Sequence, residues 1–556
     1  MKADSSTNEE PVGVMHEPEF WSLRKEALFP AVCVISAFVI RFLLIPTDGV
    51  INGDGIYYAT LGRKMMSGHL SEGISAYWSP LYSFLIGISN LFFFDLEFAG
   101  RFVSVVAGSL LIIPSYILIQ KFFGRVPAYI GTILVVVHPF LVLSSVWVMT
   151  ESVYTLIFTT AVLLGWFALK TGRRLTFFFT GLLFGAAYLT KPEAIGFIGL
   201  VFVLVLGRKL FRPNITFRSL TAGYLIFLTG FLIFFVPYVN FIHQKTGRWT
   251  ISQKLFTNSP SGGDGGLLRL TPDGKTTLQD RVWGDVYETE NARPDNSVPF
   301  VPNTEDSPRP AFDVSGLIFK TFKNLIKQFR EHVRVILPVP FLFVGVIGIF
   351  KRTGRFALRE LYLLSFVACT FIGYAVTVIE IRYLFPLIPI LMGWVAFGGE
   401  ALAGWVTKSG EFFLKTGWRI NPVFVQVLIL LILIVSLQPL YAINFAPPEI
   451  RNTSLIEKQA GLWLKQHSEP NSLVMAANAT TAFYAEAKHV FLPDEEFSRV
   501  LEYAKRKKVK YLVLSERRLR DRPEVFLLAE KAPELNLVFQ NNEFENFEVR
   551  IYRVIE

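Results

Sequence analysis

Charged residues and cysteines are both scarce in this chain. Of its 556 residues only 18% are charged, while 52% are hydrophobic and the mean hydropathy is +0.42. This composition excludes an ordinary soluble globular protein and predicts a membrane protein with several spans. The two cysteines, Cys33 and Cys369, lie inside apolar runs. Neither a disulfide framework nor a cysteine-based metal site is therefore expected.

The excess of basic residues has a simpler explanation than nucleic-acid binding. The formal net charge is +10 at pH 7, and in membrane proteins Lys and Arg collect on cytoplasmic loops. We therefore predict no nucleic-acid partner. Residues 1–26 are polar and carry no signal-peptide pattern, so we expect a cytoplasmic N-terminus. Residues 27–46 are then a retained membrane anchor.

Apolar runs of about 20 residues, the length that crosses a bilayer as a helix, recur through residues 27–442. They predict a polytopic α-helical membrane protein with about eleven transmembrane helices. The runs lie near 27–46, 101–121, 127–149, 152–169, 175–190, 194–207, 218–241, 333–350, 359–379, 384–405 and 422–442. One further apolar stretch, Ser79 to Phe94, is shorter and contains Ser, Pro and Asn, so length alone does not decide whether it crosses.

The basic residues between the runs decide this question. If residues 79–94 form an interfacial helix that does not cross, every basic cluster falls on one side, which is then the cytoplasm. The clusters are Arg24/Lys25, Lys121/Arg125, Lys170/Arg173/Arg174, Arg208/Lys209/Arg212/Arg218, Lys351/Arg352/Arg355 and Lys408/Lys415/Arg419. The external face then receives the loops 47–100 and 243–332, and also residues 450–556.

Residues 450–556 differ in composition from the rest of the chain. Lys, Glu and Arg become frequent, and short β-rich runs at 473–477, 510–514 and 548–554 alternate with helical patterns at 454–466 and 495–507. A length near 100 residues suffices for an independent core. The tail is therefore predicted to be a soluble α/β domain on the external, periplasmic side.

Two carboxylates are predicted to approach the external face from different segments. Asp54 lies in the stretch Gly53-Asp54-Gly55 after the first span, and Glu151 lies at the outer end of the third. An acidic side chain at the mouth of a membrane protein is costly to place, which favours a chemical role. The alternatives are a turn or helix cap for Asp54, and capping of the next span for Glu151.

Basic residues also occur on this face, against the cytoplasmic bias. They are Lys191, which is followed by Glu193 in one outer turn, Arg382, which lies between Glu380 and Tyr383 in another, and Arg63 after Asp54. Cations placed in this way predict an anionic ligand, and a phosphate at the outer leaflet is the simplest candidate. Two alternatives remain: Lys191 snorkels to the interface, or Arg382 pairs only with Glu380.

Histidines do not indicate a metal site. His69 and His243 lie on external segments, but no spacing of His, Cys, Asp and Glu is typical of metal ligands. The ligand spacing thus does not support a divalent metal, so we assign no metal ligand and leave the cofactor open. His138, inside a span and just before Pro139, is expected to be a packing residue.

The order of several short motifs resembles the membrane-embedded GT-C glycosyltransferases, and most of all the branch of protein O-mannosyltransferases and lipid A aminoarabinose transferases. The motifs are Asp54-Gly55-Ile56-Tyr57-Tyr58, Tyr77-Trp78-Ser79-Pro80-Leu81-Tyr82, Ala99-Gly100-Arg101-Phe102, Thr150-Glu151-Ser152, Leu189-Thr190-Lys191 and Arg382-Tyr383-Leu384-Phe385-Pro386. The resemblance covers roughly residues 27–442. Two departures occur: Gly55 stands where many members carry an acidic residue, and Trp78-Ser79-Pro80-Leu81 lacks the lysine of the aminoarabinose branch.

The resemblance implies transfer of a monosaccharide, with inversion, from a polyprenyl-phosphate donor to a lipid, glycan or protein acceptor on the external face. Asp54 would be the catalytic base, and Glu151 would orient the acceptor or Asp54. Lys191 and Arg382 would bind the phosphate. The remaining substrate-binding candidates are Tyr58, Arg63, Trp78, Tyr82, Glu193 and Tyr383. A GT-C type of fold in a bacterial inner membrane is implied as well.

Other functions fit parts of the sequence. A flippase or transporter of lipid-linked sugars would also be polytopic, although no internal repeat of the kind common in transporters is visible. A non-catalytic glycan-binding membrane protein would explain the soluble tail but not the external basic residues. Oligosaccharide transfer is the nearest alternative within the enzymes. The order of the motifs favours the monosaccharide transferase.

Overall fold

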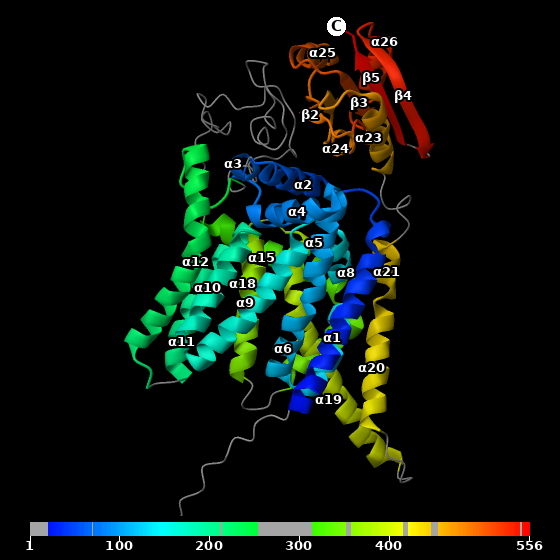
Figure 1. The fold of residues 1–556 in the computed structure, drawn as a ribbon. Coiled ribbons are helices and arrows are strands. Elements are labelled where there is room, and N and C mark those ends of the chain that lie inside the picture. The colour runs from blue at the N-terminus through cyan, green and yellow to red at the C-terminus, as the bar shows by residue number, and fades with distance from the viewer. Residues whose placement is uncertain are drawn as a thin grey trace, which may run out of the picture.

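The computed structural model describes residues 20–68, 70–211, 214–253, 314–351, 357–377, 379–414, 421–445, 454–544 and 547–555. A bundle of helices makes up most of the molecule, and a small part with a β-sheet lies above one end of it (Figure 1). The first 19 residues and residues 254–313 of the predicted external loop lie outside the described ranges.

Seven helical segments of the described residues are long and apolar enough to cross a membrane, which confirms a helical membrane protein. These segments consist of α1 (Phe20–Leu43) with η1 (Ile45–Thr47), α5 (Leu96–Leu110) with α6 (Ile112–Phe123), α9 (Glu151–Thr171), α12 (Phe217–Thr246), α18 (Ala357–Val376), η4 (Ile381–Leu387) with α19 (Ile388–Leu414), and α20 (Pro422–Ser436) with α21 (Gln438–Asn444).

Two further segments are bent, and two predicted spans are short. The helices α7 (Arg125–Val137) and α8 (Pro139–Val146) meet at 47°, and Ser315–Ile336 meets α17 (Val339–Phe350) at 107°. Counting each pair as one span gives up to nine crossings, so the predicted eleven are not reached by length and composition. The spans expected at 175–190 and 194–207 are α10 (Arg174–Tyr188) and α11 (Gly196–Phe211), which have only 15 and 16 residues.

The segment 47–100, predicted as a loop, is mostly helical. It contains α2 (Gly53–Met66), α3 (Leu70–Gly73) and α4 (Pro80–Phe93), and α2 and α4 lie across the upper end of the bundle in Figure 1. Asn52 caps α2 with its side chain, and Pro80 occupies the first turn of α4, where a proline is tolerated. The arrangement of α4 fits the interfacial helix expected for residues 79–94.

Both ends of the predicted loop 243–332 are helical in the described residues. The helix α12 continues to Thr246, and residues 314–336 form α15 (Val314–Lys327), η3 (Gln328–Val333) and α16 (Arg334–Ile336). The lysines and the threonine of α15 interrupt its apolar residues, so it does not have the continuous apolar run that marks a span. Its apolar residues recur at helical spacing instead.

Residues 454–555 contain a five-stranded sheet with the strand order β2-β1-β3-β5-β4. Its strands are β1 (Leu473–Ala476), β2 (Lys488–Phe491), β3 (Tyr511–Ser515), β4 (Leu535–Phe544) and β5 (Phe547–Val554). The first three run parallel, and β5 is antiparallel to both β3 and β4. The connecting helices are α23 (Leu455–His467), α24 (Thr480–Tyr484), α25 (Phe497–Arg506) and α26 (Glu524–Lys531). The three predicted strands and two predicted helices are all present.

The break between α7 and α8 lies inside the bundle, and side chains from other helices satisfy its backbone. Pro139 has no N–H, so carbonyl groups of the preceding turn lose their helical donors. Arg41 donates through Nη1 to the Val136 carbonyl oxygen at 3.2 Å, and the Tyr441 hydroxyl donates to that of Val137 at 2.7 Å. The His138 ring bonds the Ile336 carbonyl oxygen at 3.0 Å, which agrees with its expected packing role.

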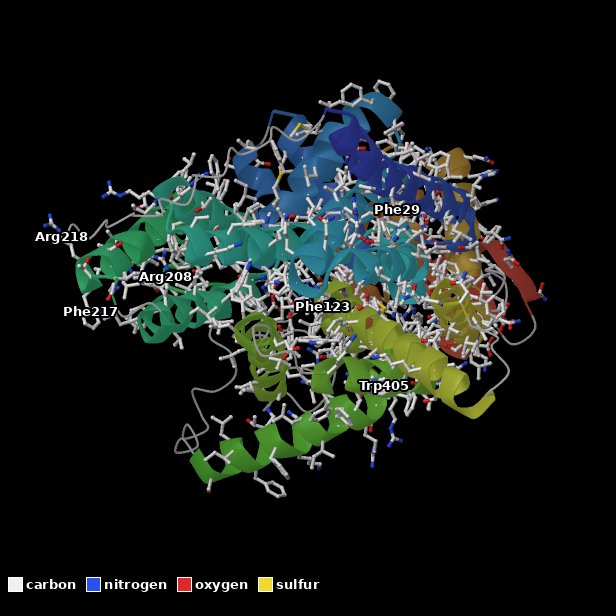
Figure 2. The ribbon with its side chains drawn as sticks, turned by 90° about the horizontal axis from the view of Figure 1, so that it is seen from below. Phe29, Phe123, Arg208, Phe217, Arg218 and Trp405 are labelled. Atoms are coloured by element: carbon white, nitrogen blue, oxygen red, sulfur yellow. The ribbon has the colours of Figure 1, made fainter. Side chains whose placement is uncertain are left out.

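The lower end of the bundle carries basic turns. Figure 2 views the molecule from below and shows Arg208 near the end of α11 and Arg218 near the start of α12. Arg173 is the N-cap residue of α10, and Arg174 is the first residue of that helix. Asp54 lies in α2 at the other end. The bundle thus separates these basic turns from the end that carries the candidate carboxylates.

Candidate functional site

Asp54 is the second residue of α2. The cap of this helix is Asn52, whose side chain accepts a hydrogen bond from the Gly55 amide at 2.6 Å. Because Asn52 takes the capping role, the Asp54 carboxylate is available to other partners. It is 39% exposed and lies 3.0 Å from Nη1 of Arg382. Asp54 is therefore a helix residue directed to a distant cation, and not the cap of α2.

Arg382 brings three carboxylates together. It lies in η4 at the start of a long helix, and its Nη1 donates to Asp54 at 3.0 Å. Its Nε donates to Oε2 of Glu380 at 2.5 Å and lies 3.9 Å from Oε1 of Glu151. Arg382 therefore pairs with Glu380, but it also contacts Asp54 and Glu151. We call Asp54, Glu151, Lys191, Glu380 and Arg382 the charged cluster.

Glu151 and Lys191 form a buried ion pair. The Lys191 Nζ lies 2.9 Å from Oε1 of Glu151, and the two side chains are 9% and 1% exposed. Glu151 begins α9, where a helix N-terminus favours a negative charge, and Lys191 precedes η2 (Pro192–Ile195). Burial shows that Lys191 does not snorkel to the interface. Oε2 of Glu151 has no hydrogen-bond partner among the described residues, so one buried acceptor is left for a ligand group or water.

The Tyr383 ring lies near both cations of the cluster. Its ring centre lies 5.1 Å from Nζ of Lys191 and 5.6 Å from Cζ of Arg382. The Tyr383 ring also stacks on that of Tyr374, with 4.6 Å between the ring centres. An aromatic ring near a cation limits where the charged head can lie. Tyr383 therefore helps to position Lys191 and Arg382 and is itself only partly buried.

The aromatic candidates Tyr58, Trp78 and Tyr82 pack mainly against one another. Their exposures are 4%, 4% and 0%, and Tyr58 meets both other rings edge-on at 5.1 and 5.4 Å. The Tyr82 hydroxyl lies 2.7 Å from Oγ of Ser104. Burial raises the pKa of Tyr58 well above its usual value, and the Asp54 carboxylate raises it further. The contacts among these rings join α2 to α4. The raised pKa keeps the Tyr58 hydroxyl, one helical turn after Asp54, in its neutral form.

Close packing explains why residue 55 is a glycine in this chain. A Cβ atom at this position would lie 2.6 Å from the Val148 carbonyl oxygen and 2.9 Å from Oδ1 of Asn52. Contacts below 3.0 Å require a shift of the backbone or of the cap. The first turn of α2 therefore approaches the segment before Glu151 as closely as glycine allows. This close approach explains why an acidic residue does not follow Asp54 here.

Two candidates lie outside the charged cluster. Arg63 is in the last turn of α2, is exposed, and lies nine residues after Asp54, which is about 13 Å along the helix. Glu193 is exposed in η2, two residues beyond Lys191. His69 lies outside the described residues. Within the described ranges, no three His, Cys, Asp or Glu side chains are grouped closely enough to hold a metal ion.

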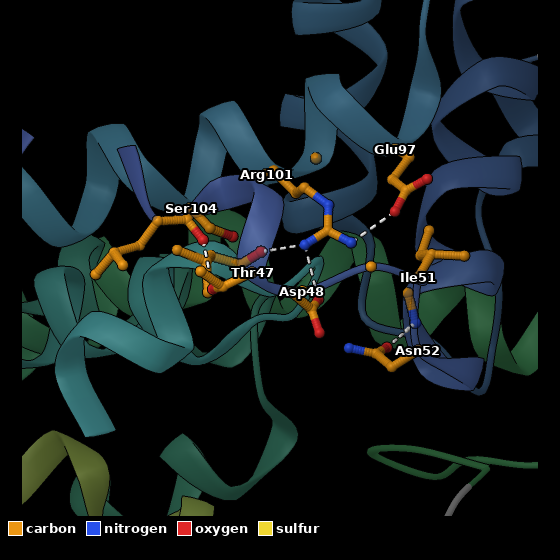
Figure 3. Close-up of polar contacts among 12 residues, drawn as sticks. Thr47, Asp48, Ile51, Asn52, Glu97, Arg101 and Ser104 are labelled. Carbon is orange, nitrogen blue, oxygen red and sulfur yellow. Dashed lines mark hydrogen bonds and ion pairs between the residues drawn. The ribbon is translucent and has the colours of Figure 1, made fainter. Parts of the chain in front are cut away.

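Sequence reasoning missed a second polar group beside α2. Arg101 in α5 is buried and donates to Asp48 at 2.7 Å, to Glu97 at 2.6 Å and to the Val146 carbonyl oxygen at 2.8 Å. Figure 3 shows the Arg101 guanidinium between the two carboxylates. The spacing of Glu97 and Arg101 by four residues on one helix was a usable signal. Asp48 could not be assigned to it from the sequence.

The tail reaches the same group. Nζ of Lys458 lies 3.3 Å from Oε2 of Glu97 and 2.9 Å from the Gly49 carbonyl oxygen. The Tyr484 hydroxyl donates to Oε2 of Glu97 and accepts from the Ile51 amide, both at 2.9 Å. We call Asp48, Glu97, Arg101, Lys458 and Tyr484 the linking cluster. It joins residues 454–555 to the segment that leads into Asp54.

Comparison with known proteins agrees with the resemblance seen in the motifs. Residues 78–239 match the family model described as dolichyl-phosphate-mannose-protein mannosyltransferase. No curated protein sequence matches the chain significantly. The family match covers less than half of the chain, so the remaining comparison depends on the fold.

The fold is similar to that of two solved membrane proteins. The apo oligosaccharyltransferase of Archaeoglobus fulgidus superposes with a TM-score of 0.57 and 14% identity, over 95% of this chain and 74% of that one. Apo ArnT of Cupriavidus metallidurans gives 0.56 and 13%, over 96% and 98%. ArnT bound to undecaprenyl phosphate gives 0.54 and 13%, over 95% and 98%. With the family match, these similarities confirm the resemblance to GT-C glycosyltransferases.

Proposed function

We propose that this chain transfers a monosaccharide from a polyprenyl-phosphate donor to a lipid, glycan or protein acceptor on the external face, with inversion. The observation that carries the proposal is the charged cluster. Asp54, Glu151, Lys191 and Arg382 come from four segments far apart in the sequence, and they meet through contacts of 2.9 to 3.9 Å. A packed bundle does not need such a group, because buried charges are costly to desolvate.

Asp54 is the proposed base. In a single displacement the acceptor hydroxyl attacks C1 of the sugar, the bond from C1 to the phosphate oxygen breaks, and the hydroxyl proton passes to Asp54. Asp54 is 39% exposed and is oriented by Arg382, whereas Glu151 is only 1% exposed. Glu380 is 45% exposed, but it pairs with Arg382 from two positions away in the same turn, while Asp54 reaches Arg382 from α2. An exposed, oriented carboxylate can reach a substrate hydroxyl. Glu151 is too buried for the same task.

Arg382 is the proposed phosphate contact. The leaving polyprenyl phosphate gains negative charge as the sugar departs, and a fixed cation stabilises that charge. Arg382 is 25% exposed and uses Nη1 and Nε for carboxylates, while no hydrogen bond of Nη2 to the described part of the chain is found. Lys191 is buried and paired with Glu151. It orients that carboxylate and adds positive charge to the buried side of the charged cluster. Of the two cations, Arg382 is thus better placed for direct contact.

A transporter of lipid-linked sugars is the main competing function. Transporters of this kind bind substrate near the middle of the membrane, at broken helices. The break between α7 and α8 is internally satisfied by Arg41 and Tyr441. The charged cluster, in contrast, lies at one end of the bundle beside α2. This location favours transfer at a membrane surface.

The test is an assay of the purified full chain with a panel of polyprenyl-phosphate monosaccharides and candidate acceptors. Asp54→Asn is expected to slow transfer by about 10²- to 10⁴-fold. The control is Asp95→Asn, because Asp95 is exposed and caps α5 by accepting from the Phe98 amide at 2.8 Å, and Asn caps equally well. Full turnover by the Asp54 variant would remove the base. A C-terminal tag that is reached only from the cytoplasm would overturn the external placement.

A further inference from the structure

The helix α15 has three distinct faces. Leu317, Thr321, Asn324 and Gln328 recur at intervals of three or four residues and are partly or fully buried. A second stripe is apolar and exposed, with Ile318 at 64%, Phe319 at 72%, Phe322 at 62%, Ile326 at 51% and Phe329 at 59%. A third stripe is basic: Lys320, Lys323, Lys327 and Arg330. A soluble surface helix does not expose such an apolar stripe.

The position of α15 relative to the site follows from two contacts. Nδ2 of Asn324 donates to the Ala375 carbonyl oxygen at 2.7 Å, and Ala375 lies in the last turn of α18. Tyr374, the neighbour of Ala375, stacks on Tyr383 of the site. Figure 1 places α15 beside α18, toward the end of the bundle that carries α2 and α4. The helix therefore borders the charged cluster.

The orientation of α15 follows from its junction with α17. Residues Ser315–Ile336 are bent by 107° from Val339–Phe350. The helix α17 packs along α19, and a Cβ on Gly348 would lie 2.0 Å from the Trp394 carbonyl oxygen, so the two helices run in close contact. Since α19 belongs to a spanning segment, α15 lies nearly in the membrane plane. An amphipathic helix in that plane directs its apolar stripe into the lipid and its basic stripe to the headgroups.

The basic residues of α15 and the two short helical segments after it outnumber the acidic residues there. Residues 314–336 carry five basic residues, Lys320, Lys323, Lys327, Arg330 and Arg334, and one acidic residue, Glu331, for a formal charge of +4. Glu331 pairs with Arg330 at 3.1 Å and approaches Lys327 at 4.0 Å. For Lys320 and Lys323 no ion pair is found in the described ranges. On an external face this excess opposes the usual distribution of basic residues and favours an anionic partner.

We propose that α15 is an in-plane docking surface for anionic phospholipid headgroups beside the donor site, with Lys320, Lys323 and Lys327 as the phosphate contacts. The assignment to the external leaflet rests on the proposed function. The apolar stripe sets the depth of the helix, and each lysine close to an anionic surface strengthens lipid binding about fivefold. Lipid phosphates held here form a local anionic environment at the edge of the charged cluster.

The first test measures depth in the membrane. Spin labels are attached at Phe322→Cys or Lys323→Cys, with Cys33 and Cys369 replaced by Ala, and the full chain is placed in nanodiscs. We expect the label at 322 to be relaxed by oxygen from the lipid, and the label at 323 by a water-soluble nickel complex. These neighbouring positions share the same local backbone and serve as controls for each other. Equal access of the nickel complex to both would overturn the in-plane placement, and shielding of both from both reagents would mean that protein covers α15.

The second test measures lipid selectivity, with no need for turnover. Nanodiscs of phosphatidylcholine contain spin-labelled phosphatidylglycerol or phosphatidylcholine, and the motionally restricted fraction of each is compared. The combined variant Lys320→Gln, Lys323→Gln and Lys327→Gln should lower the selectivity for phosphatidylglycerol about twofold or more. The matched control is Lys488→Gln, Lys505→Gln and Lys508→Gln in the tail. Unchanged selectivity in the first variant, or an equal loss in the control, would overturn the proposal.

The two proposals fail in different ways. Asp54→Asn should slow transfer by about 10²- to 10⁴-fold while leaving the selectivity for phosphatidylglycerol as in the wild type, since the contact found for the Asp54 side chain in the described residues is with Arg382 and not with α15. If the chain shows no transferase activity but keeps a lysine-dependent lipid selectivity, the proposed function fails and the docking surface stands. If transfer is found and selectivity does not depend on the α15 lysines, the docking surface fails alone.

Discussion

The Tyr484 hydroxyl accepts a hydrogen bond from the Ile51 amide at 2.9 Å, across 433 positions of sequence. Ile51 lies one residue before the cap of α2, and α2 carries Asp54 in its first turn. The same hydroxyl donates to Glu97, which is held by Arg101. The tail of the chain is thus a structural support of the segment that positions the proposed base.

Replacement of Tyr484 by Phe tests this support. The Ile51 amide and the Glu97 carboxylate each lose a partner, which costs about 1–3 kcal/mol of stability. If the contact positions Asp54, kcat should fall about tenfold, while KM for the donor changes little, because Arg382 is untouched. Tyr511→Phe is the control in the same sheet region, since no hydrogen bond of its hydroxyl is found within the described residues. Wild-type kcat and melting temperature in Tyr484→Phe would contradict the role.

The pair of Glu151 and Lys191 predicts a variant that recovers stability without activity. Lys191→Met leaves the buried Glu151 carboxylate with Arg382, at 3.9 Å, as its remaining cationic contact among the described residues, and should destabilise the chain by about 3–5 kcal/mol. Adding Glu151→Gln removes that charge and should restore most of the melting temperature in detergent. Transfer should stay low in the double variant, because the Lys191 charge and the Glu151 carboxylate beside Arg382 are both lost. Recovery of both properties together would mean that the pair has only a structural role.

Gly55 can be tested against its neighbour Gly53. A Cβ at residue 55 would meet the Val148 carbonyl oxygen at 2.6 Å, whereas a Cβ at residue 53 meets nothing within 4 Å. Gly55→Ala should therefore displace the first turn of α2, destabilise the chain by about 1–3 kcal/mol and lower transfer. Gly53→Ala should leave both nearly unchanged. Similar melting temperatures and rates for the two variants would contradict this prediction, because they would show that α2 can shift away from the Val148 carbonyl oxygen at little cost.

The sequence contained much of the site but few of its contacts. Asp54, Glu151, Lys191 and Arg382 could be identified because charged residues at a membrane face are rare and costly. Their pairing could not, since Asp54 and Arg382 are 328 positions apart and no local pattern links them. Arg63 looked equivalent to Arg382 in sequence, yet it lies at the far end of α2. Only the course of the helix in space separates the two.

The fold shows the same division between local and non-local information. Hydropathy located the helices, because each is formed from one continuous apolar run. The helices found at the predicted spans 175–190 and 194–207 have only 15 and 16 residues, and hydropathy missed the sharp bend before α17. In the tail, β2 was not predicted, and neither was β4. Its Asn and Gln residues weaken the alternation, and its pairing with β5 supplies what local propensity lacks.

Arg382→Lys separates the charge of Arg382 from its geometry. Lysine keeps the positive charge but carries one nitrogen, so it cannot bond Asp54 and Glu380 through two fixed nitrogens as Arg382 does at 3.0 and 2.5 Å. If Arg382 orients Asp54, kcat in Arg382→Lys should fall about 100-fold, which corresponds to about 2.7 kcal/mol at the transition state, while KM for the donor rises by less than about threefold.

Arg382→Ala removes the phosphate contact as well, so it should raise KM for the donor in addition to lowering kcat. Arg63→Lys is the matched control, because Arg63 is exposed in the last turn of α2 and lies outside the charged cluster. Steady-state kinetics with a single polyprenyl-phosphate sugar measure all three variants. If Arg382→Lys raises KM as much as Arg382→Ala and leaves kcat unchanged, Arg382 only binds the donor, and the orientation of Asp54 must come from another residue.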